Sequence, residues 1–197
     1  TIAPDAGAIA FNGVDITRMS AHERVRVGLA RSYQITSIFR KLTVLDNVAL
    51  AVQARTGSSL RFWQPVRAER ALYDEAGMIL GTVGLADRAD TIAGVLAHGQ
   101  QRALEVALAL ATKPSLILLD EPMAGMGPEE SERMIPLIAK LRESHSVLLI
   151  EHDMEAVFRL ADRISVLVQG KVIASGTPEA IRADAEVKRA YLGDAVA

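Results

Sequence analysis

Two adjacent carboxylates end an apolar run in the stretch LILLDEP, residues 116–122. An acid at the tip of a buried strand is costly to desolvate unless it has a partner. A hard ion such as Mg²⁺ takes one carboxylate and several waters, and a neighbouring carboxylate can orient or deprotonate a water that attacks a phosphate. This chemistry predicts Asp120 as a metal ligand and Glu121 as the residue that activates the water. The alternative is an ordinary strand that ends in a capping acid.

Two further segments could take part in the same chemistry. LAHGQQR, residues 96–102, sets Gly99 among polar residues at the start of an apolar helix, where free N–H groups and a positive dipole end attract an anion. The alternative there is a plain helix cap. Glu151 and His152 follow the next apolar strand, and a lone histidine is more often structural. Ligands of parallel sheets bind beyond the carboxyl ends of the strands, which favours a functional role for His152.

Apolar strands and helices must position these residues. The pattern predicts a mostly buried helix over 100–112, a fully buried strand over 115–120, a helix over 128–143 that starts at Pro128, and a second buried strand over 146–152. Two buried strands joined by a helix form a β-α-β unit. The sequence therefore predicts a parallel sheet covered on both faces.

The remaining segments are predicted from turn and cap residues. Asn12-Gly13 and Gln169-Gly170 indicate hairpins within 8–16 and 164–176. The stretch 36–95 holds no comparable buried strand and is predicted to be a helical insertion. Helices are expected over 20–30, opened by Ser20, over 43–55, capped by Thr43, over 67–83 and over 153–162, with short helices after 176. A strand end is expected within 31–34 and a loop at 56–65.

Composition excludes several classes of protein. The formal charge of -2 gives no basic surface for nucleic acid or anionic lipid. Half of the residues are hydrophobic and 4% are aromatic, so the core is expected to be aliphatic. The absence of cysteine excludes disulfides and thiolate metal sites. No apolar run approaches the roughly 18 residues of a membrane-spanning helix, and no signal peptide is recognised.

The motifs occur in an order that resembles a known family. Gln34, LAHGQQR, LILLDEP, AGMGP (124–128) and IEHDM (150–154) together resemble the nucleotide-binding subunit of ABC transporters. RSYQ, LTVLDNVALA, EHDMEAV, LADRISVLVQGKVIASGTPEAI and a terminal YLG resemble the ATPases of branched-chain amino-acid importers. The resemblance covers essentially the whole chain.

The resemblance implies an α/β fold with a P-loop NTPase-like, mostly parallel sheet, flanking helices and an α-helical insertion subdomain. It divides the chain into a partial ATPase core with a hairpin (1–35), the helical signature subdomain (36–99), the rest of the ATPase core (100–176) and a helical tail (177–197).

The resemblance also implies the site residues and the cofactors, ATP and Mg²⁺. Gln34 would touch the metal and the attacking water, Asp120 would bind the metal, and Glu121 would be the catalytic glutamate. His152 would bond the γ-phosphate. The signature residues would contact the γ-phosphate held by the opposite subunit; they are Leu96, Ala97, His98, Gly99 and Gln100.

The implied partners are two transmembrane permease subunits, a second ATPase subunit and, indirectly, a periplasmic or extracellular substrate-binding protein, with no nucleic acid. The implied location is peripheral, at the cytoplasmic face of the inner membrane. Ile35, Ile38 and Phe39 are apolar in a loop-like setting, so they are expected to meet a membrane subunit. The alternative is that they anchor the insertion to the core.

Three departures from the family pattern are visible. Residues 1–197 contain no Gly-x-x-x-x-Gly-Lys-[Ser/Thr] phosphate-binding motif. The chain, which starts at Thr1 without Met, is therefore expected to begin after that motif and to be inactive alone; a processed full domain is the alternative. Ala97 stands where Ser is common, and Gly127 where Asp or Asn is common. The rival functions are a soluble ABC ATPase of translation or repair and a degenerate, non-catalytic interaction module.

Overall fold

The computed structural model of the chain describes residues 4–32, 38–56 and 70–192. It divides into two compact units, residues 1–150 and 151–197. The expected loop at 56–65 lies almost entirely outside the described residues, as does Gln34.

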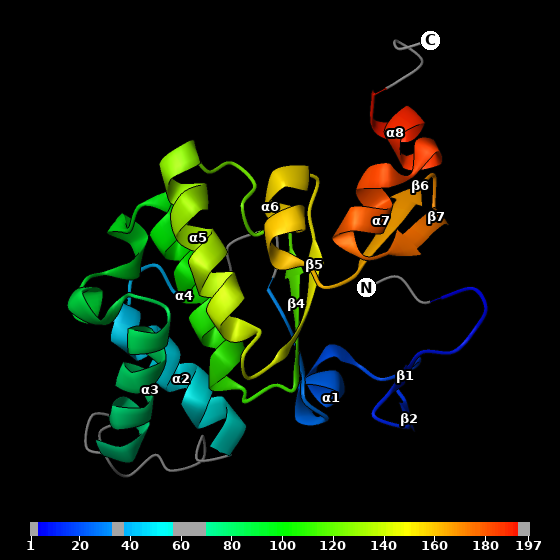
Figure 1. Cartoon of the computed structure of the whole chain (residues 1–197). Coiled ribbons are helices and arrows are strands. Elements are labelled where there is room, and N and C mark those ends of the chain that lie inside the picture. The colour runs from blue at the N-terminus through cyan, green and yellow to red at the C-terminus, as the bar shows by residue number, and fades with distance from the viewer. Residues whose placement is uncertain (1–3, 33–37, 57–69, 193–197) are drawn as a thin grey trace. The chain divides into compact units, whose positions relative to one another are not determined.

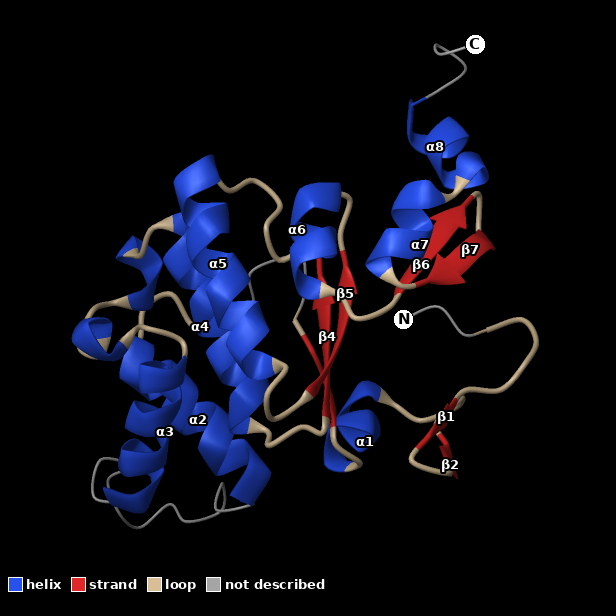
Figure 2. Cartoon of the chain, viewed as in Figure 1, coloured by secondary structure: helices blue, strands red, loops and turns tan. Residues whose placement is uncertain are grey.

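A parallel sheet is the centre of the first unit. Its strands are β3 (Leu29–Arg31), β4 (Leu116–Asp120) and β5 (Ser146–Ile150), in the order β3-β4-β5 (Figure 1). Both neighbouring pairs are parallel, and Asp120 stands opposite Ile150. Helix α5 (Pro128–Leu141) joins β4 to β5, with Pro128 in its first turn (Figure 2). The predicted β-α-β unit and parallel sheet are confirmed.

The prediction that β4 and β5 are fully buried was wrong. Burial alternates along β4, where Ile117 and Leu119 are inaccessible and their neighbours are half-buried. In β5, Leu148 is 54% exposed and Ile150 is 53% exposed. Alternation is typical of a strand packed on one side only. An apolar run predicts a strand, but what covers its second side depends on segments elsewhere in the chain.

Three helices pack together beside the sheet. They are α2 (Val44–Thr56), α3 (Arg70–Thr82) and α4 (His98–Ala111), with the 3₁₀ turns η3 (Ala86–Arg88) and η4 (Ala93–Val95) before α4. Among the described residues of 38–95 there is no strand, only an isolated bridge between Thr43 and Ile92. The described part of this stretch is therefore helical, as predicted. Its fully buried side chains include Val44, Val48, Val52, Leu80 and, from α4, Leu104.

Ion pairs and a cap fix these helices locally. Arg55 of α2 bonds both carboxylate oxygens of Glu75 on α3, at 2.9 and 2.8 Å, and Lys113 lies 3.1 Å from the same carboxylate. Thr43 caps α2 as predicted, because its hydroxyl accepts the N–H of Asp46 at 3.0 Å.

Helix α1 (Ala21–Arg26) is shorter than the predicted 20–30. Ser20 opens it, and the Glu23 carboxylate accepts the Ser20 N–H at 2.7 Å. The helix ends because Gly28 adopts a φ of +96°, a left-handed conformation that turns the chain into β3. Leu29 and Ala30 are therefore strand residues.

Both predicted hairpins are confirmed. Strands β1 (Ala10–Phe11) and β2 (Val14–Asp15) flank Asn12-Gly13. Strands β6 (Ile164–Val168) and β7 (Lys171–Gly176) flank Gln169-Gly170. All four turn residues have positive φ, as two-residue hairpin turns of this kind require.

The second unit contains α6 (Met154–Leu160), the β6–β7 hairpin, α7 (Pro178–Ala183) and α8 (Ala185–Leu192). Its core is formed by Ile164, Val166, Ile181 and Val187. Asp153 caps α6 by accepting the N–H groups of Glu155 and Ala156.

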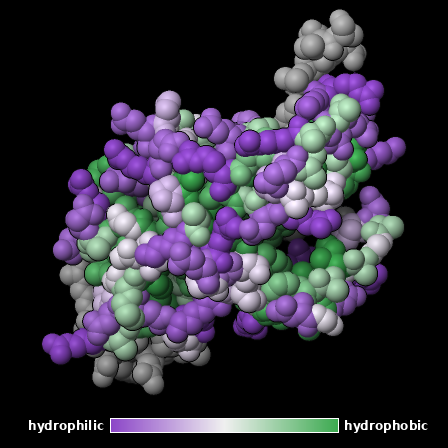
Figure 3. Space-filling view, viewed as in Figure 1, coloured by the Kyte–Doolittle hydropathy of each residue, from purple (hydrophilic) through white to green (hydrophobic). Residues whose placement is uncertain are grey.

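In the part of the chain that the structure describes, no helix has the length and apolar character needed to cross a bilayer. Hydrophilic residues cover much of the first unit in the face shown in Figure 3, with hydrophobic residues between them.

Candidate functional site

Asp120 lies at the carboxyl end of β4 and is paired with a cation. Nη2 of Arg31, at the end of the neighbouring strand β3, is 2.6 Å from Oδ2 of Asp120. The Asp120 side chain is 21% exposed and that of Arg31 is 49% exposed. The carboxylate predicted to bind metal is therefore engaged by an arginine through Oδ2. Sequence reasoning missed Arg31, although its place at the end of a strand was a usable signal.

Glu121 has an unusual backbone conformation. Its φ is +47°, in the left-handed region that residues other than glycine enter at a cost of about 1 kcal/mol or more. Its N–H donates to the Ile150 carbonyl at 2.8 Å, and its own carbonyl accepts the Ala124 N–H at 3.1 Å. These bonds hold the strained residue in place. Strain of this kind is concentrated at functional sites, which supports the predicted role of Glu121.

The segment Leu96–Gln100 forms the start of α4. Leu96 is buried, and its carbonyl accepts the side-chain N–H of Gln101 at 2.8 Å. The side-chain oxygen of Gln100 accepts the Ala97 N–H at 3.2 Å. Ala97 occupies the N-cap position without an oxygen of its own. As the sequence predicted, Gly99 lies at the N-terminal, positive end of a largely buried helix.

An anion from within the chain already contacts this helix start. Oε1 of Glu130, in the first turn of α5, accepts the Gly99 N–H at 3.1 Å. Sequence reasoning missed Glu130, because 31 residues separate the two partners. His98 lies beside Gly99 at the exposed surface of the helix start.

A cleft of about 420 Å³ lies between α1, β3 and α4. Arg24, Arg31 and Glu105 are its charged lining residues, and Val25 and Leu108 belong to its apolar wall. Glu105 also bonds Arg102 at 2.9 Å in a nearly inaccessible pair. Because Arg31 lines this cleft and bonds Asp120, the cleft reaches the carboxyl edge of the sheet.

His152 and Glu151 belong to the second unit. The Glu151 carboxylate accepts the His152 N–H at 3.2 Å, and Nδ1 of His152 lies 3.9 Å from the same oxygen. The His152 side chain is 75% exposed, whereas that of Glu151 is 1% exposed. His152 is thus accessible to a ligand, and Glu151 fixes the backbone from which it projects.

The donor set fits Mg²⁺ bound together with a nucleotide. In the described chain no cluster of three or more His, Cys, Asp or Glu side chains could hold a metal by itself. Mg²⁺ commonly uses one or two carboxylates, with waters and substrate phosphates completing its shell. Asp120 and Glu121 at one strand end supply that number of carboxylates.

Comparison with known proteins agrees with the geometry. The model of the ABC transporter family matches residues 1–124, and the model described as branched-chain amino acid ATP-binding cassette transporter matches residues 171–197. The high-affinity branched-chain amino acid transport ATP-binding protein BraF of Pseudomonas aeruginosa is 40% identical, over 98% of this chain and 78% of BraF. LivG of Escherichia coli is 39% identical over the same shares.

Solved structures show the same fold. A nucleotide-free ATP-binding cassette from an ABC transporter matches with a TM-score of 0.80 and 27% identity, over 98% of this chain and 79% of that one. An ATP-binding cassette in its ADP conformation matches with a TM-score of 0.80 and 28% identity, over 96% and 78%. The predicted α/β, P-loop NTPase-like fold is confirmed. The chain belongs to the ATP-binding family of ABC transporters and is similar to its branched-chain amino-acid transport members.

Proposed function

We propose that the chain is the ATP-binding and ATP-hydrolysing part of an importer of branched-chain or other hydrophobic amino acids. The observation that carries the proposal is the acid pair Asp120–Glu121 at the carboxyl end of β4, with Glu121 held at positive φ. The names of BraF and LivG support the substrate class. A lipopolysaccharide export ATP-binding protein of Haemophilus influenzae is also 34% identical, so a transport assay must decide the substrate.

Each site residue has a proposed role. Mg²⁺ bound with ATP would neutralise charge on the phosphates; Asp120 would hold the metal and Glu121 would orient the attacking water. The amides at the start of α4, within Leu96–Gln100, would bind the phosphate of a nucleotide held by a second ATPase subunit. His152 would bond the γ-phosphate, and Gln34 would contact metal and water. The division at residues 35, 99 and 176 remains part of this proposal.

The test is hydrolysis by the chain extended at its N-terminus with a segment that carries the Gly-x-x-x-x-Gly-Lys-[Ser/Thr] motif. Glu121→Gln keeps the shape of the side chain but removes its ability to take a proton. Steady-state turnover is expected to fall by about 100-fold or more, while ATP binding persists. The matched control is Glu129→Gln on the exposed first turn of α5, which is expected to turn over normally. Wild-type turnover in Glu121→Gln would contradict the role of Glu121.

Residues 1–197 alone are proposed to bind Mg·ATP weakly and to be inactive, because they contain no phosphate-binding motif. Calorimetric titration of the unextended chain with Mg·ATP tests this. Micromolar affinity would contradict it.

The proposed partners are two permease subunits at the cytoplasmic face of the membrane, a second copy or homologue of this ATPase, and indirectly a substrate-binding protein. Phe39 is the proposed permease contact, because its side chain is 61% exposed. Ile38 is half-buried, which fits an anchoring role, and Ile35 lies outside the described residues. Phe39→Ala is expected to reduce co-purification with the permeases. Met78→Ala, also at an exposed position, is the control.

A further inference from the structure

The contact between Glu130 and Gly99 is close as well as hydrogen-bonded. A Cβ added to Gly99 would lie 3.1 Å from Oε1, 3.2 Å from Cδ and 3.3 Å from Cβ of Glu130. The Glu130 side chain therefore lies along the backbone at Gly99, in space that only glycine leaves free. The Glu130 side chain thus contacts the helix start from its Cβ to its carboxylate, not through the carboxylate alone.

The start of α4 has a physical need for such a partner. The first amides of a helix have no carbonyl within the helix, and the N-cap residue usually supplies an oxygen. Ala97 has none to supply, and regular helix bonding begins only at Gln101, whose N–H donates to the Ala97 carbonyl at 2.9 Å. Glu130 acts as a cap supplied by a different helix. Its negative charge also lies at the favourable end of the α4 dipole.

We propose that Glu130 is an internal anion that bonds the Gly99 amide and must release it when a phosphate docks there. This inference rests on the proposed function, in which the start of α4 receives the phosphate of the partner subunit's nucleotide. The Gly99 N–H has one proton to donate, so it cannot serve both groups at full strength. A phosphate bound to the same amide would also repel the Glu130 carboxylate, because both groups are negatively charged.

The position of Glu130 makes its release consequential. Its N–H donates to the Gly127 carbonyl at 3.0 Å, in the first turn of α5. The loop that leads into this turn begins at Asp120 and Glu121. Displacement of the carboxylate would remove the hydrogen bond between the start of α4 and the first turn of α5. The Gly99–Glu130 contact thus sets how much ATP is needed to close the ATPase dimer.

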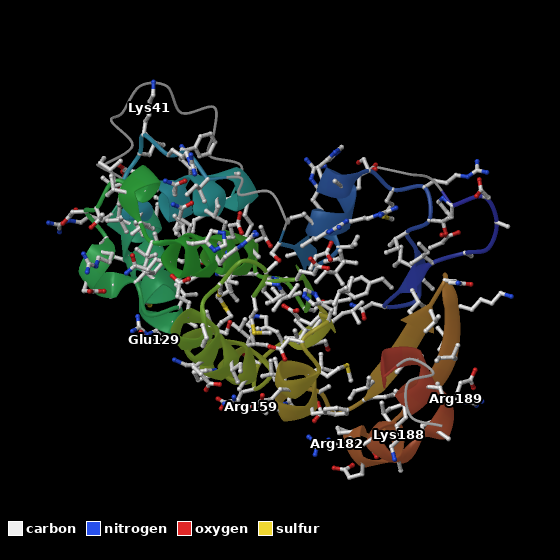
Figure 4. The ribbon with its side chains drawn as sticks, turned by 90° about the horizontal axis from the view of Figure 1, so that it is seen from above. Lys41, Glu129, Arg159, Arg182, Lys188 and Arg189 are labelled. Carbon is white, nitrogen blue, oxygen red and sulfur yellow. The ribbon has the colours of Figure 1, made fainter. Side chains whose placement is uncertain are left out.

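The first experiment removes the charge and keeps the acceptor. In the N-terminally extended chain, Glu130→Gln leaves a side-chain oxygen for the Gly99 N–H but removes the anion. The ATP concentration for half-maximal dimerisation and hydrolysis is expected to fall by about fivefold. The matched control is Glu129→Gln, one residue earlier on the same turn. Glu129 lies at the periphery in Figure 4, its side chain is 91% exposed, and its substitution is expected to change this concentration by less than about twofold.

The second experiment needs no nucleotide. Glu130→Ala in residues 1–197, without the N-terminal extension, is expected to lower the melting temperature by about 2 to 4 °C, because α4 loses its cap. Ala97→Ser supplies an oxygen at the N-cap and is expected to remove most of that loss in the double variant. This coupling identifies the amide of α4 as the group that Glu130 serves.

The outcomes separate this inference from the proposed function. An extended wild-type chain that neither binds nor hydrolyses ATP would overturn both. Normal hydrolysis with an unchanged or higher half-saturating ATP concentration in Glu130→Gln would overturn the inference alone. Loss of stability in Glu130→Ala that Ala97→Ser does not restore would also overturn it.

Discussion

At the scale of single residues, Glu121 combines a carboxylate that is proposed to orient the attacking water with a strained backbone. Its φ of +47° costs glycine nothing, a glutamate about 1 kcal/mol, and a β-branched residue more. Glu121→Gly is therefore expected to change the free energy of unfolding by less than about 0.5 kcal/mol, since relief of strain offsets the added flexibility of the unfolded chain. Glu121→Val is expected to lower it by about 1 to 2 kcal/mol. Urea denaturation checks both; equal losses would contradict the strain.

The pH dependence of stability has an identifiable source in Glu75. Hydrogen bonding from Arg55 lowers the pKa of the Glu75 carboxyl below 4.5, although burial opposes the shift, and Lys113 adds to the lowering. A carboxyl with a lowered pKa in the folded state stabilises the protein above its unfolded pKa. That stability is lost as the pH falls through the folded value.

Glu75→Gln tests this source directly. At pH 7 the variant is expected to lose about 1 to 2 kcal/mol of unfolding free energy, because the ion pair between α2 and α3 is broken. Below pH 4.5 the difference from wild type is expected to shrink. The control is Asp74→Asn, an exposed neighbour on the same helix. A difference that stays constant from pH 7 to about 3 would contradict the assignment.

At the scale of elements, Asn47 fastens the segment before α2 to the helix. Its side-chain oxygen accepts the Phe39 N–H at 2.8 Å, and its amide donates to the carbonyls of Phe39 and Thr43 at 3.1 and 2.8 Å. The side chain is buried, and truncation leaves the Phe39 N–H without its acceptor, whereas the carbonyls of Phe39 and Thr43 still accept the N–H groups of Leu42 and Asn47. Asn47→Ala is expected to lower the free energy of unfolding by about 1 to 3 kcal/mol in urea denaturation, and Gln53→Ala on the same helix by much less. Equal losses of unfolding free energy in the two variants would contradict this role of the Asn47 side chain.

Elements that depend on adjacent residues could be predicted from the sequence. Asn12-Gly13 and Gln169-Gly170 set the backbone of two hairpins. Thr43 marks a helix start through a bond made within one turn, and Pro128 marks another because its ring fixes φ at a helical value. The acid pair at the end of β4 was also readable, because its position follows from the strand itself.

Contacts between distant segments could not be predicted in the same way. Arg31 and Asp120 are 89 positions apart, and Gly99 and Glu130 are 31 apart. These partners meet only after the sheet and helices have assembled. The exposure of β5 could not be predicted for the same reason. An apolar sequence predicts a strand, but it does not show which distant segments pack against that strand. Gly28 was a missed local signal, because a left-handed residue there ended the helix early.

At the scale of the whole molecule, the order of motifs carried more information than any single motif. Five weak stretches in one sequence order predicted a family that the matches to BraF and LivG confirm over 98% of the chain. The transported compound is a different matter. In the proposed assembly the transported compound contacts other subunits, so its identity cannot be predicted from the residues of this chain.

The partly exposed edge strand β5 is expected to make the purified chain self-associate. Leu148 and Ile150 present apolar side chains to solvent on one side, and β5 pairs with β4 alone among the described strands. Exposed edge strands of this kind template pairing between molecules. Purified chains of residues 1–197 should therefore self-associate as concentration rises, which light scattering would register. Leu148→Lys is expected to reduce this self-association, because it places a charge on the exposed side of β5.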